Sequence, residues 1–171
     1  DCLLSRGLGD VYKRQIEDVA YHTACVARGS KTAFVMSDMP FGSYATKEDA
    51  FKNAVKLVQA GAQMVKIEGG AWMADTVRFL TERAIPVMVH LGLTPQFVHQ
   101  FGGYKVQGKT AEAAEQMKSD ALLLQDAGAA MLLLEAIPAA LGKSVTEAIA
   151  MPTIGIGAGP DCSGQVLAVS Y

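Results

Sequence analysis

Four short apolar segments each end on a polar or ionisable residue, and this pattern constrains the fold of the chain more than any other feature. Segments of this length, separated by stretches with helical periodicity, are typical of parallel strands in a β/α protein. In a (β/α)₈ barrel the C-terminal ends of the strands converge on one active-site mouth. We therefore expect the residues that end these segments to meet in space. The segments are Ala33–Asp38, Met64–Glu68, Val87–His90 and Met131–Glu135.

Five ionisable side chains are expected at this mouth. Side chains alternate between the two faces of a strand, so Lys66 and Glu68, which are two residues apart, point the same way. A general base, an ammonium group and acidic metal ligands in one mouth favour metal-assisted carbanion chemistry. The five residues are Asp38, Lys66, Glu68, His90 and Glu135.

Each of these residues also has a purely structural interpretation. Asp38 suits a turn at a strand end, and Lys66 with Glu68 could form an ion pair that lines a barrel. His90 could satisfy a backbone carbonyl group, and no second histidine nearby completes a transition-metal site. Glu135 is the hardest to explain structurally, because a carboxylate that ends an apolar strand loses hydration unless it is paired or used. Glu135 is therefore the best candidate for a general base.

Composition favours small-molecule chemistry. The chain has 171 residues, of which 50% are hydrophobic, and its net charge of −2 argues against a nucleic-acid surface. Charged, Gly or Pro residues interrupt every apolar stretch, so no transmembrane helix and no signal peptide are predicted. We expect a cytoplasmic protein with no nucleic-acid or membrane partner. The three cysteines lack the spacing of a metal site or a disulfide framework.

Helical patterns alternate with the apolar segments, which predicts one domain. Thr46 and Asp49 resemble a capping box, Thr94-Pro95 supplies an N-cap followed by proline, and Ser144 with Glu147 forms a capping box that should open the helix before the last strand. The other predicted elements are helices over Ile16–Ala27, Thr46–Gln59, Met73–Arg83 and Thr110–Asp126, and a fifth strand over Thr153–Ile156.

Two glycine-containing segments do not carry the function that their letters suggest. Gly155–Pro160 lacks the third glycine and helix start of a dinucleotide-binding fold. Gly103–Thr110 matches the letters of a phosphate-binding P-loop, but it follows a helix-like segment and not a buried strand. We interpret Gly103–Thr110 as a loop near the mouth.

Six ordered motifs resemble one known family, ketopantoate hydroxymethyltransferase. The resemblance covers the chain from about Ile16 to about Leu167. The motifs are DMPFGSYAT (Asp38–Thr46), AGAQMVKIEGG (Ala60–Gly70), VHLGLTPQ (Val89–Gln96), FGGYKVQGK (Phe101–Lys109), LLLEAIP (Leu132–Pro138) and PTIGIGAG (Pro152–Gly159).

The resemblance implies a fold and a reaction. The fold is a partial (β/α)₈ TIM barrel of the phosphoenolpyruvate/pyruvate-binding type. The enzyme transfers a hydroxymethyl group from 5,10-methylenetetrahydrofolate to 3-methyl-2-oxobutanoate in pantothenate biosynthesis, giving 2-dehydropantoate through a Mg²⁺-stabilised enolate. The full-length protein is expected to be a homo-oligomer, a homodecamer in the family.

Each site residue takes a role from the same resemblance. Asp38 and Glu68 bind Mg²⁺, Glu68 either directly or through water. Asp38, Lys66 and His90 lie at the keto acid. Glu135 removes the proton from the carbon next to the ketone.

Both ends of the chain differ from the family pattern. Asp10–Gln15 (DVYKRQ) matches the translation of a transposon end used in sequencing libraries, and Ala168–Tyr171 matches the translation of the same end read on the opposite strand. We therefore expect residues 1–15 and 168–171 to be non-native and 16–167 to be the barrel segment. The family's Asp-Ser pair in a GDS motif, a second metal carboxylate and substrate contact, is missing. The chain by itself is expected to be inactive.

Two other functions are compatible with the residues. Another Mg²⁺-dependent barrel that acts on α-keto acids, of the isocitrate lyase/phosphoenolpyruvate mutase type, would share acidic metal ligands at strand ends. The lyases usually carry a catalytic cysteine in a KKCGH-like loop, and no cysteine lies between Met39 and Ala130. The chain could also be a noncatalytic barrel fragment that serves assembly.

Overall fold

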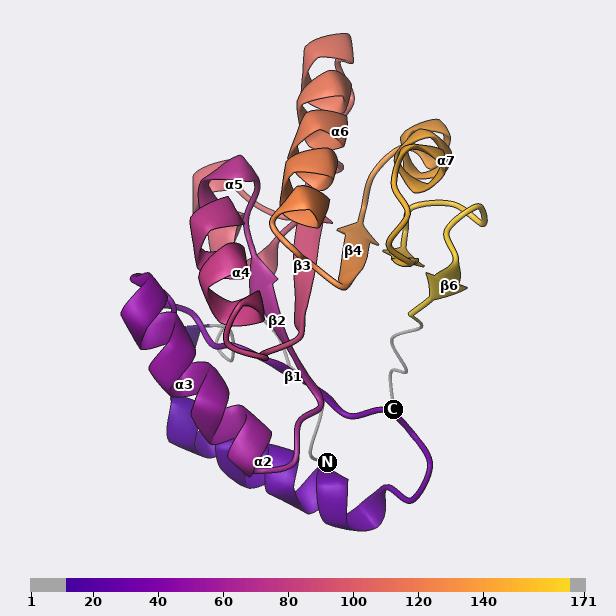
Figure 1. The fold of residues 1–171 in the computed structure, drawn as a ribbon. Helices are drawn as coiled ribbons and strands as arrows, with labels where there is room; N and C mark the ends of the chain where they lie inside the picture. Colours follow the sequence, from indigo (N-terminus) through magenta and orange to yellow (C-terminus); the bar gives the residue numbers. More distant parts are fainter. Residues whose placement is uncertain (1–11, 167–171) are drawn as a thin grey trace.

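A curled sheet of six parallel strands forms the centre of the computed structural model, which describes residues 12–166 (Figure 1). The strands follow one another in sequence order, as expected for consecutive β/α units. This arrangement is a half-barrel, which confirms the predicted partial TIM-barrel class. The strands are β1 (Met36–Asp38), β2 (Met64–Glu68), β3 (Val87–Gly92), β4 (Met131–Glu135), β5 (Thr153–Ile156) and β6 (Gly164–Gln165).

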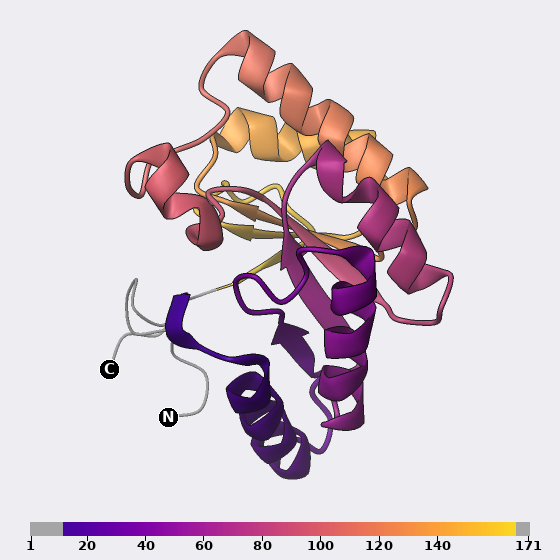
Figure 2. The same ribbon diagram turned by 90° about the vertical axis from the view of Figure 1, so that its left-hand side faces the viewer.

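Helices surround the sheet in an arc, at the bottom, right and top of Figure 2. Neighbouring helices pack side by side in chain order: α2 on α3, α3 on α4, α4 on α6, and α6 on α7. None of the helices in residues 12–166 is long and apolar enough to cross a membrane. The helices are α2 (Ile16–Gly29), α3 (Lys47–Gln59), α4 (Ala74–Thr81), α5 (Val98–Phe101), α6 (Ala111–Asp126) and α7 (Ala139–Ala148), with 3₁₀ turns η1 (Ala71–Met73) and η2 (Pro95–Phe97).

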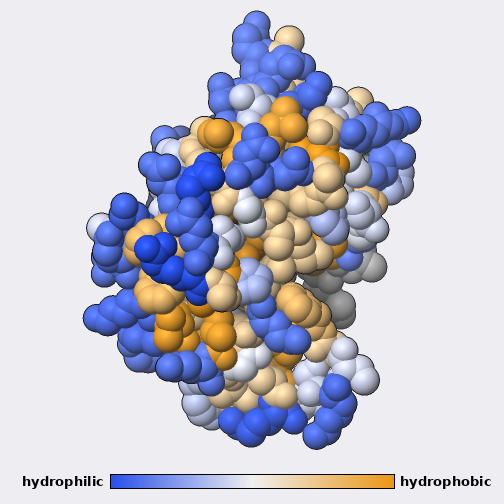
Figure 3. Space-filling view, viewed as in Figure 1, coloured by the Kyte–Doolittle hydropathy of each residue, from blue (hydrophilic) through white to orange (hydrophobic). Residues whose placement is uncertain are grey.

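Alternation along the strands separates two apolar layers. Val65 and Ile67 of β2 belong to the large core that packs against the helices. Met64, Met88 and Leu133 form a smaller cluster on the other face of the sheet. Lys66 and Glu68 continue the row that begins at Met64, so the ionisable strand ends extend this inner face. On the outside, Figure 3 shows hydrophilic residues interspersed with hydrophobic patches.

Several predicted boundaries are wrong in detail. β1 begins at Met36 rather than Ala33, and the predicted helix over Met73–Arg83 is divided into η1 and α4. The Ser144 capping box does not open a helix, because α7 begins five residues earlier, at Ala139. The carbonyl oxygen of Pro138 accepts hydrogen bonds from the Leu141 and Gly142 N–H groups, so the first turn closes there. The two-residue strand β6 was not predicted, since it carries no apolar run.

Gly92 ends β3 in a conformation that only glycine fits. Its φ is +94°, and an added Cβ would lie 2.2 Å from the carbonyl oxygen of Glu135. The next N–H group, from Leu93, donates to that same oxygen over 2.8 Å. This close approach fixes the backbone of Glu135 against the end of β3.

Gly92→Ala is expected to lower the free energy of unfolding by about 3 kcal/mol, because left-handed strain and a steric clash add together. The matched control is Gly42→Ala. Gly42 also has a positive φ, +78°, but nothing lies within 4 Å of its added Cβ. The control should therefore lose only about 1 kcal/mol. Urea unfolding of the three proteins tests this, and equal losses in both variants would contradict the close contact.

Candidate active site

The five predicted site residues meet at the C-terminal ends of the first four strands. Strand pairing aligns Asp38 with Lys66, Glu68 with His90, and Gly92 with Glu135. Because all four strands are parallel, their last residues lie at one edge of the sheet. The structure therefore brings together residues that are far apart in sequence. Their individual roles stay predictions.

An ion pair joins the ends of β1 and β2. Lys66 Nζ lies 2.8 Å from Asp38 Oδ2, with the lysine side chain 12% exposed and the aspartate 61% exposed. Burial alone would lower the pKa of Lys66, but the charges of Asp38, Glu68 and Glu135 outweigh it and raise that pKa. Lys66 is thus an ammonium group at neutral pH. It supplies a fixed positive charge at the mouth.

Glu68 is the most deeply buried carboxylate of the five-residue cluster. Its residue is 3% exposed, and its Oε2 accepts a hydrogen bond from the Gln96 backbone N–H over 3.0 Å. Burial raises the pKa of Glu68 to about 7, although Lys66 and the Gln96 N–H act in the opposite direction. Without a bound metal ion, the Glu68 carboxylate therefore takes up a proton near neutral pH.

His90 lies between two carboxylates and is 1% exposed. Its Nδ1 is 3.8 Å from Glu68 Oε1, and its Nε2 is 3.3 Å from Glu135 Oε2. Neither ring nitrogen makes an aligned hydrogen bond to any residue in the described part of the chain. Burial lowers the pKa of His90, so the ring is neutral. Two buried ring nitrogens without hydrogen bonds are what a substrate-binding histidine would offer a ligand.

Glu135 reaches the open side of the cluster. Its side chain is 23% exposed, against 4% for Glu68, so its carboxylate is accessible from the mouth. The next residue, Ala136, has a positive φ of 47°, a backbone conformation that non-glycine residues rarely adopt. An accessible carboxylate beside a neutral imidazole can accept a proton from a bound molecule.

The donor atoms of the cluster fit a divalent cation whose remaining ligands come from water and a substrate. Residues 12–166 contain no group of three or more acidic, His or Cys side chains arranged to hold a metal ion. Mg²⁺ is often bound by only one or two carboxylates, with water and substrate oxygens as its other ligands. Asp38 and Glu68 are carboxylates of this kind. The cluster is suited to a cation that binds together with an oxygen-rich substrate.

Ionisation of Glu68 should make stability depend on pH. A carboxyl group whose pKa rises from 4.5 to about 7 on folding stabilises the protein below pH 4.5, and that stabilisation is lost as pH rises to 7. The loss is roughly 3 kcal/mol. Urea unfolding from pH 4.5 to 8 in EDTA should therefore show a steeper fall for the wild-type chain than for Glu68→Gln. Parallel curves of unfolding free energy against pH would contradict the claim that Glu68 is buried and protonated near neutral pH in the folded protein.

Two polar residues beside the cluster, Tyr44 and Gln96, were not predicted from the sequence. Both are buried, and the Tyr44 hydroxyl donates to Gln96 Oε1. Thr94 was predicted as an N-cap, but its side chain makes no capping hydrogen bond and the turn after it is 3₁₀. The only sequence signal for Tyr44 and Gln96 was their place in the DMPFGSYAT and VHLGLTPQ motifs.

Part of the predicted non-native leader lies outside the described residues, as does the predicted tail. Of the described leader residues, Tyr12 donates a hydrogen bond to the Gln96 carbonyl oxygen over 3.0 Å. Its ring also stacks on His99 at 4.9 Å. Residues 12–15 bring no carboxylate to the cluster. The assignment of this segment as non-native stays a prediction.

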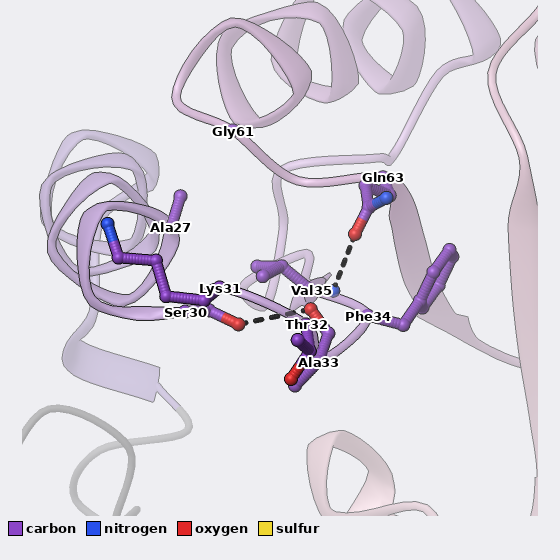
Figure 4. Close-up of a pocket in the computed structure, with 9 residues that line it drawn as sticks. All are labelled: Ala27, Ser30, Lys31, Thr32, Ala33, Phe34, Val35, Gly61 and Gln63. Carbon is purple, nitrogen blue, oxygen red and sulfur yellow. Dashed lines mark hydrogen bonds between the residues drawn. The ribbon is translucent and has the colours of Figure 1, made fainter.

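A pocket of about 340 Å³ lies at the N-terminal ends of β1 and β2, whereas the cluster lies at the C-terminal strand ends (Figure 4). Two of its polar groups are paired within the lining: Val35 N–H donates to Gln63 Oε1, and Ser30 Oγ donates to the Ala33 carbonyl oxygen. It contains none of the five cluster residues. The predicted chemistry is therefore assigned to the strand ends and not to this pocket.

Solved structures with a similar backbone define the fold class. The chain matches phosphonopyruvate hydrolase with a TM-score of 0.62 and 11% identity, over 85% of this chain and 53% of that one. It matches 2,3-dimethylmalate lyase, a PEP mutase/isocitrate lyase superfamily member, with a TM-score of 0.58 and 15% identity, over 83% and 51% of the two chains. The chain thus has the α/β-barrel fold of this superfamily.

Sequence comparison identifies the family within that class. A model of the ketopantoate hydroxymethyltransferase family matches residues 4–170, so the chain belongs to this family. A 3-methyl-2-oxobutanoate hydroxymethyltransferase from Janthinobacterium sp. (strain Marseille) is 93% identical over 152 residues, which are 89% of this chain and 56% of the relative. One from Ralstonia nicotianae is 60% identical, over 96% of this chain and 63% of the relative. The chain thus spans about 60% of the length of these relatives.

Proposed function

We propose that the whole protein containing this segment transfers a hydroxymethyl group from 5,10-methylenetetrahydrofolate to 3-methyl-2-oxobutanoate, giving 2-dehydropantoate. The observation that carries the proposal is the arrangement of Glu135, His90 and Lys66 at one sheet edge. An accessible base, a neutral imidazole and a fixed cation together suit proton removal next to a ketone. The relatives' name supports the identity of the substrate.

Each residue then has a task in the reaction. Glu135 accepts the proton from C3 of the keto acid. Lys66 offers its charge to the substrate's oxygen atoms, and His90 offers one ring nitrogen as a donor. Asp38 and Glu68 would hold Mg²⁺, which supplies Lewis-acid stabilisation of the negative charge that develops on the ketone oxygen. The carbanion carbon forms a C–C bond to the one-carbon unit of the folate cosubstrate. The two C–N bonds that hold this unit to the folate break, water supplies the hydroxyl oxygen, and tetrahydrofolate leaves.

The test uses a full-length chimera, in which the 152 residues shared with the Janthinobacterium relative replace their counterparts in that protein. With Mg²⁺ present, the chimera should exchange the C3 proton of 3-methyl-2-oxobutanoate for deuterium, and should form 2-dehydropantoate when the folate cosubstrate is added. Exchange that is absent in the chimera but present in the unmodified relative would contradict the proposal.

The 171-residue chain by itself is proposed to be inactive, because the second metal carboxylate expected from the GDS motif is missing. Assayed beside the chimera, it should show no turnover above background. Turnover at a rate comparable to the chimera would mean that residues outside this segment are dispensable.

A cytoplasmic location and homo-oligomeric assembly of the whole protein also stay predictions. The mass of the chimera by analytical ultracentrifugation tests the assembly.

The second candidate, a lyase or mutase reaction on another α-keto acid, rests on the shared fold. The same chimera separates the two reactions. Cleavage or rearrangement of a phosphonate or dicarboxylate substrate without folate would favour the second reaction. Folate-dependent gain of one carbon would favour the first.

A further inference from the structure

Gln96 joins the ends of three strands. It lies in η2, directly after β3, and is 9% exposed. Its backbone N–H donates to Glu68 Oε2 over 3.0 Å, and its Nε2 donates to the Met39 carbonyl oxygen over 2.9 Å. Its Oε1 accepts the Tyr44 hydroxyl. One residue therefore holds the Glu68 carboxylate and the carbonyl group of Met39, the residue after Asp38.

Tyr44 completes this network from the loop after β1. Its hydroxyl donates to Gln96 Oε1 and accepts the backbone N–H of Glu68 over 3.4 Å. Burial, followed by the charge of Glu68, raises the pKa of Tyr44, so the hydroxyl remains a donor at neutral pH. The Glu68 backbone and carboxylate are thus held by two neighbouring side chains.

Met39 transmits this constraint to Asp38. The Met39 N–H donates to the Lys66 carbonyl oxygen over 2.9 Å, while its own carbonyl oxygen accepts Gln96 Nε2. Met39, the residue after Asp38, is therefore held at its N–H group by β2 and at its carbonyl group by η2. Only the Asp38 side chain itself remains open to solvent.

We propose that Tyr44 and Gln96 are positioning residues that set the separation of the Asp38 and Glu68 carboxylates for a divalent cation, an inference that rests on the proposed function. A buried polar network in which every member is satisfied holds one arrangement. Hydrogen bonds that orient metal-binding side chains typically change metal affinity by roughly 10- to 100-fold when removed. A network that only stabilised the fold would leave metal affinity unchanged.

The test measures Mg²⁺ affinity by calorimetry in the full-length chimera, with and without the keto acid. Tyr44→Phe removes one hydroxyl and keeps the ring, and it should weaken Mg²⁺ binding roughly tenfold. Gln96→Met removes the side-chain donor and acceptor but keeps the backbone N–H, and it should cause a similar loss. Since the two side chains share one hydrogen bond, which either single variant already removes, the double variant should lose less than the product of the two single effects.

The matched control is Thr146→Val, which removes a hydroxyl bonded to Thr153 Oγ1 at 2.8 Å, at the N-terminal end of β5, whereas the cluster lies at the C-terminal strand ends. It should lower thermal stability while Mg²⁺ affinity stays within about twofold. If Tyr44→Phe and Gln96→Met both bind Mg²⁺ like the wild type, the positioning role is overturned. If the wild-type chimera binds Mg²⁺ but exchanges no substrate proton, the proposed function fails, while the affinities of the variants still decide the positioning role.

Discussion

Glu135→Gln is expected to slow deuterium exchange at C3 of 3-methyl-2-oxobutanoate by roughly 10²- to 10⁴-fold in the full-length chimera, because an amide cannot accept that proton at neutral pH. The glutamine has nearly the same shape, so binding of Mg²⁺ and of the keto acid should stay within about threefold of the wild type. Proton NMR in deuterated water measures the exchange, and calorimetry measures the binding.

The control for this loss is Glu147→Gln. Glu147 pairs loosely with Lys143 on the surface of α7, at 3.9 Å, and both side chains are exposed. Removing its charge should therefore leave exchange unchanged. Wild-type exchange in Glu135→Gln would contradict the role of Glu135 as base. The neighbouring buried carboxylate, Glu68, would then be the next candidate.

The meeting of the five ionisable residues could be predicted because each lies in the C-terminal part of a buried strand. β2, β4 and β5 begin and end where the sequence analysis placed them. Buried parallel strands are short apolar runs, and the residue that breaks the run marks the strand end. Parallel pairing then brings these ends to one edge of the sheet.

The depth of each carboxylate could not be predicted in this way. Glu68 and Glu135 both end an apolar strand, and the sequence analysis expected desolvation to matter most for Glu135. In the structure Glu68 is the deeper one, because η2 and Tyr44 cover it, whereas Glu135 faces the mouth. Burial at a strand end is decided by the loops of neighbouring strands, and no periodicity within the strand records it.

The hydrogen bonds of Tyr44 and Gln96 were missed for a related reason. Gln96 is 52 residues from Tyr44 and 57 from Met39 along the chain. A side-chain bond across such a separation depends on the conformation of two loops. The start of α7 shows the same limit, because the carbonyl group of Pro138 closes the first turn and makes the later Ser144 signal irrelevant.

Asp38→Asn is expected to weaken Mg²⁺ binding by at least roughly tenfold in the full-length chimera, because hard cations prefer charged carboxylates to neutral amides. The fold should change little. The Asp38 side chain is largely exposed, so its pair with Lys66 contributes on the order of 1 kcal/mol or less. Lys66 also keeps Glu68 and Glu135 as nearby opposite charges.

Lys66→Met separates metal binding from substrate binding at the same site. In the free protein the Lys66 ammonium competes with a cation for Asp38, at 2.8 Å. Its removal should therefore raise Mg²⁺ affinity while keto-acid affinity falls, since the substrate carboxylate loses its cationic partner. Calorimetry of the two variants with Mg²⁺ alone, and then with the keto acid, distinguishes these effects. Unchanged Mg²⁺ affinity in Asp38→Asn would mean that Asp38 is only the counter-charge of Lys66 and binds no metal.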